Sequence, residues 1–161
     1  MREIKIQSAS PRSLAALNRL FADAVAGHFD YFSSDVQRQV IRDHSVPKLL
    51  LATIDPRRVI LVARHGRRII GYAIGAAPSA GPAQLYWLYV DPDFRGANTG
   101  LSLLSRMLKT LAAKGAREVS IATHDHRKYY ERQGFRFIEN KPVHNVNMDI
   151  LVFRLGGAKR K

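Results

Sequence analysis

One segment limits the fold of this chain more than any other: residues 83–123 pass from strand to helix and back to strand. The run "AQLYWLYV" (83–90) is apolar and aromatic and has the length of a strand, as does "EVSIAT" (118–123). Between them, from about Thr99 to Lys114, apolar residues recur at helical spacing, and Gly115 is placed to end the helix. Such a crossover joins two parallel strands of one sheet with a right-handed connection. The segment therefore predicts a sheet that contains a parallel strand pair.

The flanking sequence extends this unit into a larger mixed sheet. Serine caps helices and proline is tolerated in their first turn, so we expect three upstream helices, starting at Ser10-Pro11, at Ser33 or Ser34, and at Ser45. Strands are expected at 3–7, 59–64, 67–77, 135–139 and 146–155, and a short helix at 125–133. The pattern predicts an α/β (α+β) fold, a mixed central sheet flanked by helices, in a single domain over 1–155. The basic residues 156–161 are expected to form a flexible tail.

Composition narrows the chemistry. The 161 residues carry a formal net charge of +13 and no cysteine, which excludes disulfides, a thiolate nucleophile and cysteine metal ligands. We expect no membrane contact and a cytoplasmic location, because no apolar run has the length of a signal peptide or a membrane span. The positive charge has two interpretations that stay open: a soluble basic surface, or attraction of an anionic partner, either nucleic acid or a phosphate-rich cofactor.

The stretch "VDPDFRGANTG" (90–100) leads from the first parallel strand into the crossover helix. The first backbone N–H groups of a helix have no partner within it, and together with the helix dipole they bind anions. Glycines at 96 and 100 let a phosphate approach the backbone, and Arg95 adds a positive charge in the same turn. The stretch indicates a pyrophosphate site; an ordinary turn shaped by glycine is the alternative. It is neither a Walker loop nor the G-x-G-x-x-G dinucleotide pattern.

In two motifs the chain resembles the GCN5-related N-acetyltransferases. The first is Val90-Asp91-Pro92 followed by Arg95-Gly96-Ala97-Asn98-Thr99-Gly100, where the family has a strand, a proline turn and a glycine-rich helix start. The second is Tyr130 four residues before Gly134-Phe135 on a short helix. The resemblance covers nearly the whole chain, and the order of the elements also agrees.

This resemblance implies a parallel strand pair that splays apart and acetyl-CoA lying in the gap. The backbone of Leu88, Tyr89 and Val90 is then expected to pair with the pantetheine arm. The residues implied in holding the pyrophosphate are Arg95, Gly96, Ala97, Asn98, Thr99 and Gly100.

Asn98 departs from the family pattern, since it stands where the motif has its first glycine. Asparagine tolerates left-handed backbone better than most residues, so the loop can keep its path. Asparagine is also a favoured N-cap, and a capping side chain would occupy an amide that a phosphate needs. Both interpretations stay open at this point.

The resemblance also assigns a general acid. Acetyl transfer to an amine needs a proton for the departing thiolate, stabilisation of the carbonyl oxygen and removal of a proton from the amine. Tyr130 stands at the family's thiolate-protonating position, with packing of the short helix as its alternative role. Tyr129 beside it is expected to be structural, and the oxyanion donor is expected to be the backbone N–H of Val90 or its neighbour.

The general base is less clearly marked. Several relatives carry a glutamate early in the motif strand, where this chain has Gln84, which cannot accept a proton. The candidates are His124, Asp125 and His126, because sites form where parallel strands end and histidine titrates near neutral pH. One alternative is that "HDH" is a solvated loop and helix cap; another is that no side chain serves and water relays the proton. No metal is expected there, because no further ligands cluster with these side chains.

The acceptor side is implied by the segment "HFDYF" (28–32), which borders the acceptor pocket in the family and offers His28, Asp30 and Tyr31. A loop anchored by its two phenylalanines is the alternative. The function expected is acetyl-CoA-dependent transfer of an acetyl group to a primary amine. A basic nucleic-acid-associated protein and a non-catalytic acyl-CoA-binding relative are the alternatives. The identity of the amine and the choice between monomer and homodimer stay open.

Overall fold

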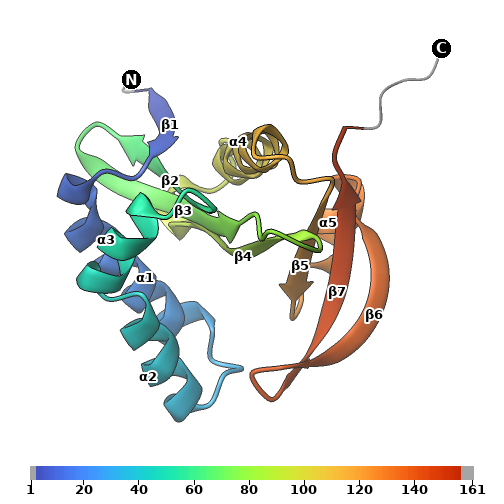
Figure 1. Cartoon of the computed structure of the whole chain (residues 1–161). Helices are drawn as coiled ribbons and strands as arrows, with labels where there is room; N and C mark the ends of the chain where they lie inside the picture. The colour runs from blue at the N-terminus through green and yellow to red at the C-terminus, as the bar shows by residue number, and fades with distance from the viewer. Residues whose placement is uncertain (1–2, 157–161) are drawn as a thin grey trace.

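Seven strands form one mixed sheet in the order β1-β2-β3-β4-β5-β7-β6 (Figure 1). All neighbouring strands are antiparallel except β4 and β5, which are the predicted parallel pair. The computed structural model describes residues 3–156. Its strands are β1 (Ile4–Ser8), β2 (Arg58–His65), β3 (Arg68–Ala76), β4 (Ala83–Val90), β5 (Glu118–Thr123), β6 (Arg136–Val143) and β7 (Val146–Arg154). Its helices are α1 (Leu14–His28), α2 (Ser34–Asp43), α3 (Val46–Ile54), α4 (Thr99–Ala113) and α5 (Arg127–Arg132), with 3₁₀ turns η1 (Pro11–Ser13) and η2 (Pro92–Phe94).

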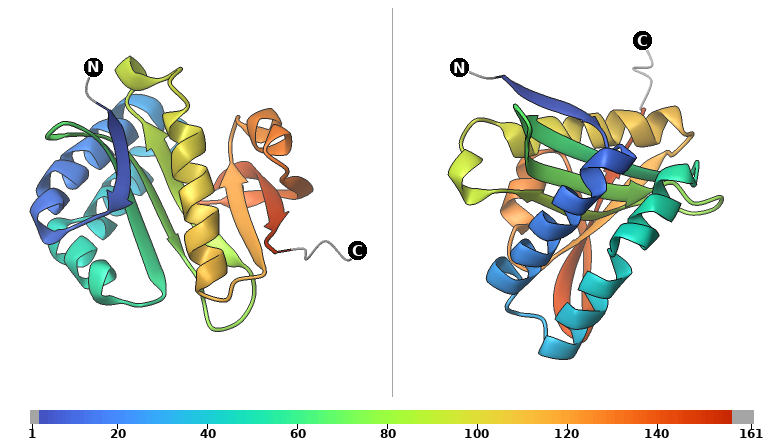
Figure 2. Two further views of the ribbon diagram at one scale, coloured as in Figure 1. Left: turned by 90° about the horizontal axis from the view of Figure 1, so that it is seen from above. Right: turned by 90° about the vertical axis from the view of Figure 1, so that its left-hand side faces the viewer.

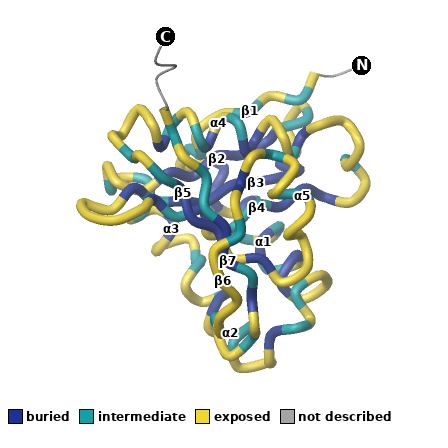
Figure 3. Tube along the Cα trace, turned by 90° about the vertical axis from the view of Figure 1, so that its right-hand side faces the viewer, coloured by how far each residue is buried: buried dark blue, intermediate teal, exposed yellow. Residues whose placement is uncertain are grey.

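Helices cover both faces of the sheet. The crossover helix α4 packs on one face of β1–β4, while α1 and α3 pack on the opposite face (Figure 2). Strand β2 is buried on both of its faces. Leu61 faces the core beneath α4, whereas Ile60 and Val62 face the core beneath α1 and α3. A strand that is covered on both faces needs apolar residues at successive positions, so the sequence of β2 is a continuous apolar run rather than an alternating one. Figure 3 shows the buried residues along these central strands, with α2 and β6 largely exposed.

The parallel pair separates part of the way along its length. Pairing between β4 and β5 extends only from Ala83 with Val119 to Leu85 with Ile121, although β4 continues to Val90. The register of β4 against β3 skips Tyr86, so this residue forms a β-bulge at the point where the two parallel strands part. A bulge bends its strand and increases the local twist. The predicted splayed pair is therefore confirmed, and the bulge supplies its local cause.

The predicted strands and helices are all present, with differences at their ends. The strand expected at 135–139 continues to Val143, because β6 is an edge strand and the missing N–H of Pro142 costs no ladder bond there. Helix α5 begins at Arg127 rather than 125, because the N–H of His126 donates to Thr123 Oγ1 at 3.0 Å and closes a turn first. Of the predicted basic tail, residues 157–161 lie outside the described part of the chain. No helix within residues 3–156 is long and apolar enough to cross a membrane.

Candidate functional site

The turn between β4 and α4 is fixed by polar contacts at its base. The buried carboxylate of Asp91 accepts the N–H of Asp93 at 3.0 Å and pairs with Arg68 at 2.7 Å. Arg95 donates from Nε to the carbonyl of Val90 at 3.0 Å, and its guanidinium lies over the ring of Tyr89. The positive charge predicted at Arg95 is thus held at the start of the glycine-containing loop.

Asn98 adopts left-handed backbone at the start of α4. Its φ and ψ are 58° and 19°, and its side chain makes no capping hydrogen bond. Of the two interpretations of Asn98, left-handed backbone is therefore the one that the structure bears out, and the cap is not formed. Gly96 also has positive φ, at 90°, which favours glycine there.

A cleft of about 570 Å³ lies beside this turn, and we call it the loop cleft. Thr99, the first residue of α4, lines it, and the Thr99 hydroxyl oxygen is buried without a hydrogen-bond partner in the described part of the chain. A buried hydroxyl of this kind costs free energy unless a ligand or water completes it. Helix start, arginine and orphan hydroxyl together suit an anionic group such as a phosphate. The cleft is lined by His28, Phe29, Leu88, Tyr89, Val90, Arg95, Gly96, Asn98, Thr99, Gly100, Leu101, Asp125, His126, Tyr129 and Tyr130.

The backbone of β4 offers hydrogen-bonding groups to the gap left by the splay. The N–H of Asp91 donates to Ile70 of β3, and the carbonyl of Tyr89 lies against Gly71 of β3. Neighbouring residues of a strand direct their polar groups to opposite edges. Leu88 and Val90 therefore turn theirs toward β5, where the ladder has ended. Of the three residues predicted to pair with a ligand, Tyr89 is the one whose backbone is engaged within the sheet.

Tyr130 is positioned by the end of α5. Gly134, with φ of 98°, closes the helix: its N–H donates to Glu131, and the N–H of Phe135 donates to the carbonyl of Tyr130 at 3.1 Å. This is a Schellman motif, in which the first residue past the glycine packs on the helix. The rings of Tyr130 and Phe135 do so, with centroids 5.4 Å apart. The spacing of tyrosine, glycine and phenylalanine in the sequence is thus the spacing that this helix end requires.

The hydroxyl of Tyr130 keeps its proton well into the alkaline range. Burial, and then the neighbouring Tyr129 and Tyr31, raise the pKa of Tyr130 far above its ordinary value. Tyr130 also lines a second cavity of about 420 Å³, the aromatic pocket, which is lined by residues 84–88 of β4, whereas the loop cleft is lined by residues 88–90. The residues common to both cavities are Phe29, Leu88, Asp125, His126 and Tyr130. We call the place where they meet the junction, and a proton donor stands there.

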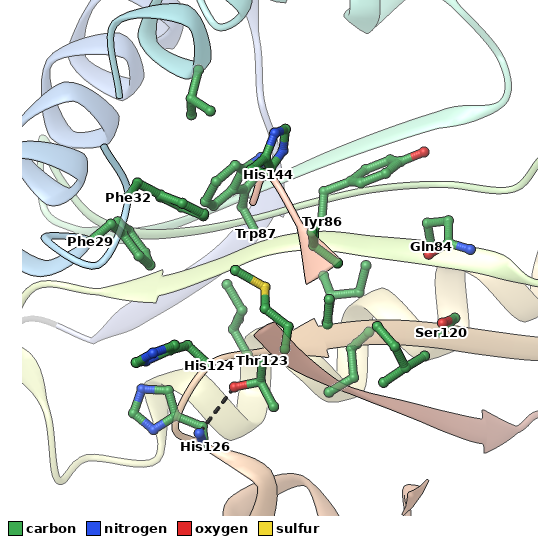
Figure 4. A pocket seen from close by; sticks show the side chains of 18 of the residues that line it. Phe29, Phe32, Gln84, Tyr86, Trp87, Ser120, Thr123, His124, His126 and His144 are labelled. Atoms are coloured by element: carbon green, nitrogen blue, oxygen red, sulfur yellow. Dashed lines mark hydrogen bonds between the residues drawn. The ribbon is translucent and has the colours of Figure 1, made fainter. Parts of the chain in front are cut away.

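The aromatic pocket lies between the α1–α2 loop (29–33), the end of β4 and the β6–β7 hairpin (Figure 4). Phe29, Phe32 and Trp87 form one wall, and His124 and His126 lie across from them (Figure 4). Further members are Tyr31, Val40, Asp43, His44, Gln84, Leu85, Tyr86, Ser120, Thr123, Lys141, Val143, His144, Met148 and Ile150. A cavity of this size with few charged groups suits a small organic molecule.

The three residues predicted on the acceptor side separate in the structure. Tyr31 lines the aromatic pocket, and burial, then the carboxylates of Asp125 and Asp30, raise the pKa of Tyr31. His28 lines the loop cleft instead, with its ring 5.7 Å from that of Tyr89. Asp30 is exposed and lines neither cavity. Sequence places all three in one loop, but the turn directs their side chains to different places.

The candidate bases lie where β5 ends. His124 and Asp125 are exposed at the pocket wall, and Asp125 Oδ1 lies 3.3 Å from Nε2 of His126. Asp125 reaches the junction, whereas His124 lines only the aromatic pocket. Gln84 also lines the pocket but lies in the paired part of β4, opposite Ser120. Within residues 3–156, no group of three or more His, Asp or Glu side chains is arranged to hold a metal ion.

Two features of the site were not predicted. Tyr129 was expected to be structural, but it lines the loop cleft, and its hydroxyl is 3.8 Å from where a Cβ at Gly100 would lie. Trp87 and Tyr86 line the aromatic pocket from β4. The aromatic run at 83–90 marks a strand, but the bulge that redirects its side chains has no signal in the sequence.

Comparison with known proteins gives consistent results. The family model of the acetyltransferase (GNAT) domain matches residues 56–137, about half of the chain. Uncharacterized N-acetyltransferases of Mycobacterium bovis and Mycobacterium tuberculosis are 34% identical over 86 residues, covering 51% of this chain and 55% of each relative. The match thus spans about half the length of these relatives.

Solved structures share the fold over nearly the whole chain. The PaiA N-acetyltransferase of Thermoplasma acidophilum, in complex with coenzyme A, has a TM-score of 0.79 at 22% identity and covers 94% of this chain and 99% of its own. A GNAT-family acetyltransferase of Staphylococcus aureus Mu50 has a TM-score of 0.78 at 17% identity, covering 96% and 100%. YncA of Salmonella typhimurium, solved with its cofactor acetyl-CoA, has a TM-score of 0.69 at 16% identity, covering 99% and 98%. At these identities the likeness is one of fold.

Proposed function

This chain belongs to the GNAT acetyltransferase family, and from that membership we propose that it transfers an acetyl group from acetyl-CoA to a primary amine. The observation that carries the proposal is the junction, where a polar strand edge opened by the splay and a half-buried tyrosine meet between two cavities. One cavity suits phosphates and the other suits a small organic molecule, so two substrates can meet there. Two cavities that join at a proton donor are what a transfer between two substrates requires.

The loop cleft is proposed to hold the CoA moiety. The amides from Gly96 to Gly100 and the charge of Arg95 would bind the pyrophosphate, and the unpartnered hydroxyl of Thr99 would donate to a phosphate oxygen. The backbone groups of Leu88 and the N–H of Val90 would bind the pantetheine arm, since the carbonyl of Val90 already accepts from Arg95 Nε. The bound acetyl-CoA supplies the thioester, which is the activated acyl group.

Residues at the junction and next to it would handle each proton and charge in the transfer. The neutral amine nitrogen forms a bond to the thioester carbon, and the N–H of Val90 or Leu88 stabilises the negative charge that develops on the oxygen. As the carbon–sulfur bond breaks, Tyr130 donates its proton to the leaving sulfur. The extra proton of the amine passes to Asp125, to His124 or to water. The half-buried Tyr130 is protonated at neutral pH, as this role requires.

Release of free thiol from acetyl-CoA in the presence of a panel of amines tests the proposal, with mass spectrometry of the acetylated product. Amine-dependent thiol release with matching product is expected. Binding of CoA without turnover of any amine would instead favour a non-catalytic acyl-CoA-binding protein.

A further inference from the structure

Building on the acetyltransferase function proposed above, we propose that the acceptor is a small monoamine with an aromatic body, which lies in the aromatic pocket against Trp87. The shape, the wall chemistry and the charge of this pocket each contribute to the assignment.

The size and shape of the aromatic pocket suit a small, flat molecule. The pocket encloses about 420 Å³, which is within the range of sites for small molecules. One wall is aromatic, made of Phe29, Phe32 and Trp87, and the lining also contains Met148 and Ile150 of β7. A flat apolar body fits between walls of this kind, because rings stack or meet edge-on with other rings and also contact thioether sulfur favourably.

The aromatic wall is held in place before any ligand arrives. The Trp87 ring meets Phe29 edge-on at 5.6 Å and 76°, and Phe32 at 6.4 Å and 72°. Behind them Phe21 meets Trp87 at 5.2 Å and 85°. Because each ring is fixed by others, binding an aromatic ligand orders few side chains, and preorganisation of this kind favours affinity.

The charge of the pocket suits one ammonium group at the junction. Among the pocket's described residues the carboxylates are Asp43 and Asp125. Asp43 is engaged by Lys48 at 2.9 Å, and this hydrogen bond lowers the pKa of Asp43. Asp125 reaches the junction, where the reacting nitrogen must lie.

A second ammonium group would have no such partner. It would lie against aromatic and aliphatic walls, near Lys141, whose ammonium group is itself paired with Glu139 at 3.5 Å. His44 adds no negative charge, and burial lowers its pKa so that it stays neutral. An ammonium taken from water without a partner is costly. The net charge of +13 also repels polycations at long range. Polyamines and lysine-rich peptides are therefore disfavoured.

The test compares phenethylamine with ethylamine, spermidine and a lysine peptide as acceptors at saturating acetyl-CoA. Burial of the ring predicts a kcat/KM for phenethylamine about ten- to a hundredfold above that of ethylamine. Spermidine and the peptide are expected to fall below phenethylamine. A higher kcat/KM for spermidine or the peptide would overturn the assignment while leaving the acetyltransferase function intact.

A binding measurement separates the two proposals. Trp87 is the single tryptophan of the chain, so its fluorescence reports on the pocket directly. In the presence of CoA, phenethylamine is expected to quench or shift this emission saturably, and spermidine is not. Saturable quenching without acetyl transfer to any amine would sink the proposed function but support the ligand class. Acetyl transfer to spermidine with no fluorescence response to phenethylamine would support the acetyltransferase function but overturn the ligand class.

Variants of Tyr86 test the pocket lining next to the aromatic wall, because Tyr86 lines the pocket beside Trp87. Tyr86 is 52% exposed, so its truncation is tolerated by the fold. Tyr86→Ala is expected to raise KM for phenethylamine several-fold with little change in KM for acetyl-CoA, and Tyr86→Phe, which keeps the ring, is expected to restore it. Ile138→Ala, an exposed apolar residue outside both cavities, is the matched control. Equal effects of Tyr86→Ala and Ile138→Ala would overturn the placement of the aromatic acceptor in this pocket.

Discussion

The ring of Tyr31 lies flat on the imidazole of His124, with centroids 4.2 Å apart and planes inclined by 12°. This stack joins the α1–α2 loop to the end of β5, so it connects the two sides of the splayed strand pair. It fixes the orientation of the imidazole beside the junction, and Tyr31 in turn contributes to the raised pKa of Tyr130. Tyr31 thus orients a candidate base through this stack, and it also helps to keep the candidate acid Tyr130 protonated.

The base is tested by the pH dependence of kcat/KM. If Asp125 or His124 accepts the proton, kcat/KM rises with pH through an ionisation of the free enzyme, and Asp125→Asn or His124→Ala loses that limb. Amines of different basicity provide the comparison. If the rise of kcat/KM with pH follows the pKa of the amine and persists in both variants, no side chain serves as base.

Substitution of Tyr130 by phenylalanine tests the acid. Tyr130→Phe keeps the ring that packs on Phe135 but removes the proton. We expect unchanged CoA binding and thermal stability, with kcat lower by about a hundredfold or more. Because the pKa of Tyr130 is raised, its proton is retained below pH 10.0, the ordinary tyrosine value, and no alkaline loss of kcat from this group is expected there. Activity within a few-fold of the parent would leave Tyr130 with a packing role only.

Gly134 tests whether the helix end positions Tyr130. Its φ is 98°, and a Cβ there would lie 3.1 Å from Cε2 of Phe153. Gly134→Ala is therefore expected to destabilise the fold by about 1–2 kcal/mol or more, measured by chemical denaturation, and to lower kcat. The control is Gly27→Ala in α1, where a Cβ meets nothing within 4 Å and a gain of about 0.5–1 kcal/mol is expected. A Gly134→Ala variant as stable and active as the parent would contradict the positioning role.

Asn98 is expected to be replaceable by glycine. Its left-handed backbone suits glycine, and no capping hydrogen bond would be lost. Asn98→Gly should bind CoA as well as the parent in calorimetry, with a change in unfolding free energy of a few tenths of a kcal/mol. A tenfold loss of CoA affinity in a stable variant would mean that the side chain contacts the ligand.

Much of the fold follows from patterns that are local in sequence. The helical period of α4, the glycine at 115 and the strand runs on either side determine the parallel pair before any tertiary contact is known. Glycine stops also locate the helix ends, because positive φ at 115 and 134 is a backbone requirement. The end of the helix that carries Tyr130 could be located for the same reason, whereas the role of Tyr130 is implied by the family resemblance alone.

The remaining site features depend on geometry that the sequence does not carry. The bulge at Tyr86 arises from the register between β3 and β4, and it decides which aromatic side chains of β4 face the pocket. Tyr129 reaches the loop cleft because α5 lies beside the start of α4, which is a tertiary relationship. His28 ends α1, whereas Asp30 and Tyr31 lie in the loop that follows, and the three side chains lie in different places.

Calorimetric titration of the parent and of Gly100→Val with CoA and with pantetheine tests the central claim, that acetyl-CoA lies with its pyrophosphate at the start of α4. A Cβ at Gly100 meets Val90 and Tyr129 at 3.7 and 3.8 Å, so the fold tolerates it, while valine would occupy space that a phosphate needs. The expected result is saturable CoA binding by the parent, far weaker binding of pantetheine, and loss of CoA binding in a folded Gly100→Val variant. Equal affinities for CoA and pantetheine, or parent-like CoA binding by Gly100→Val, would contradict this placement.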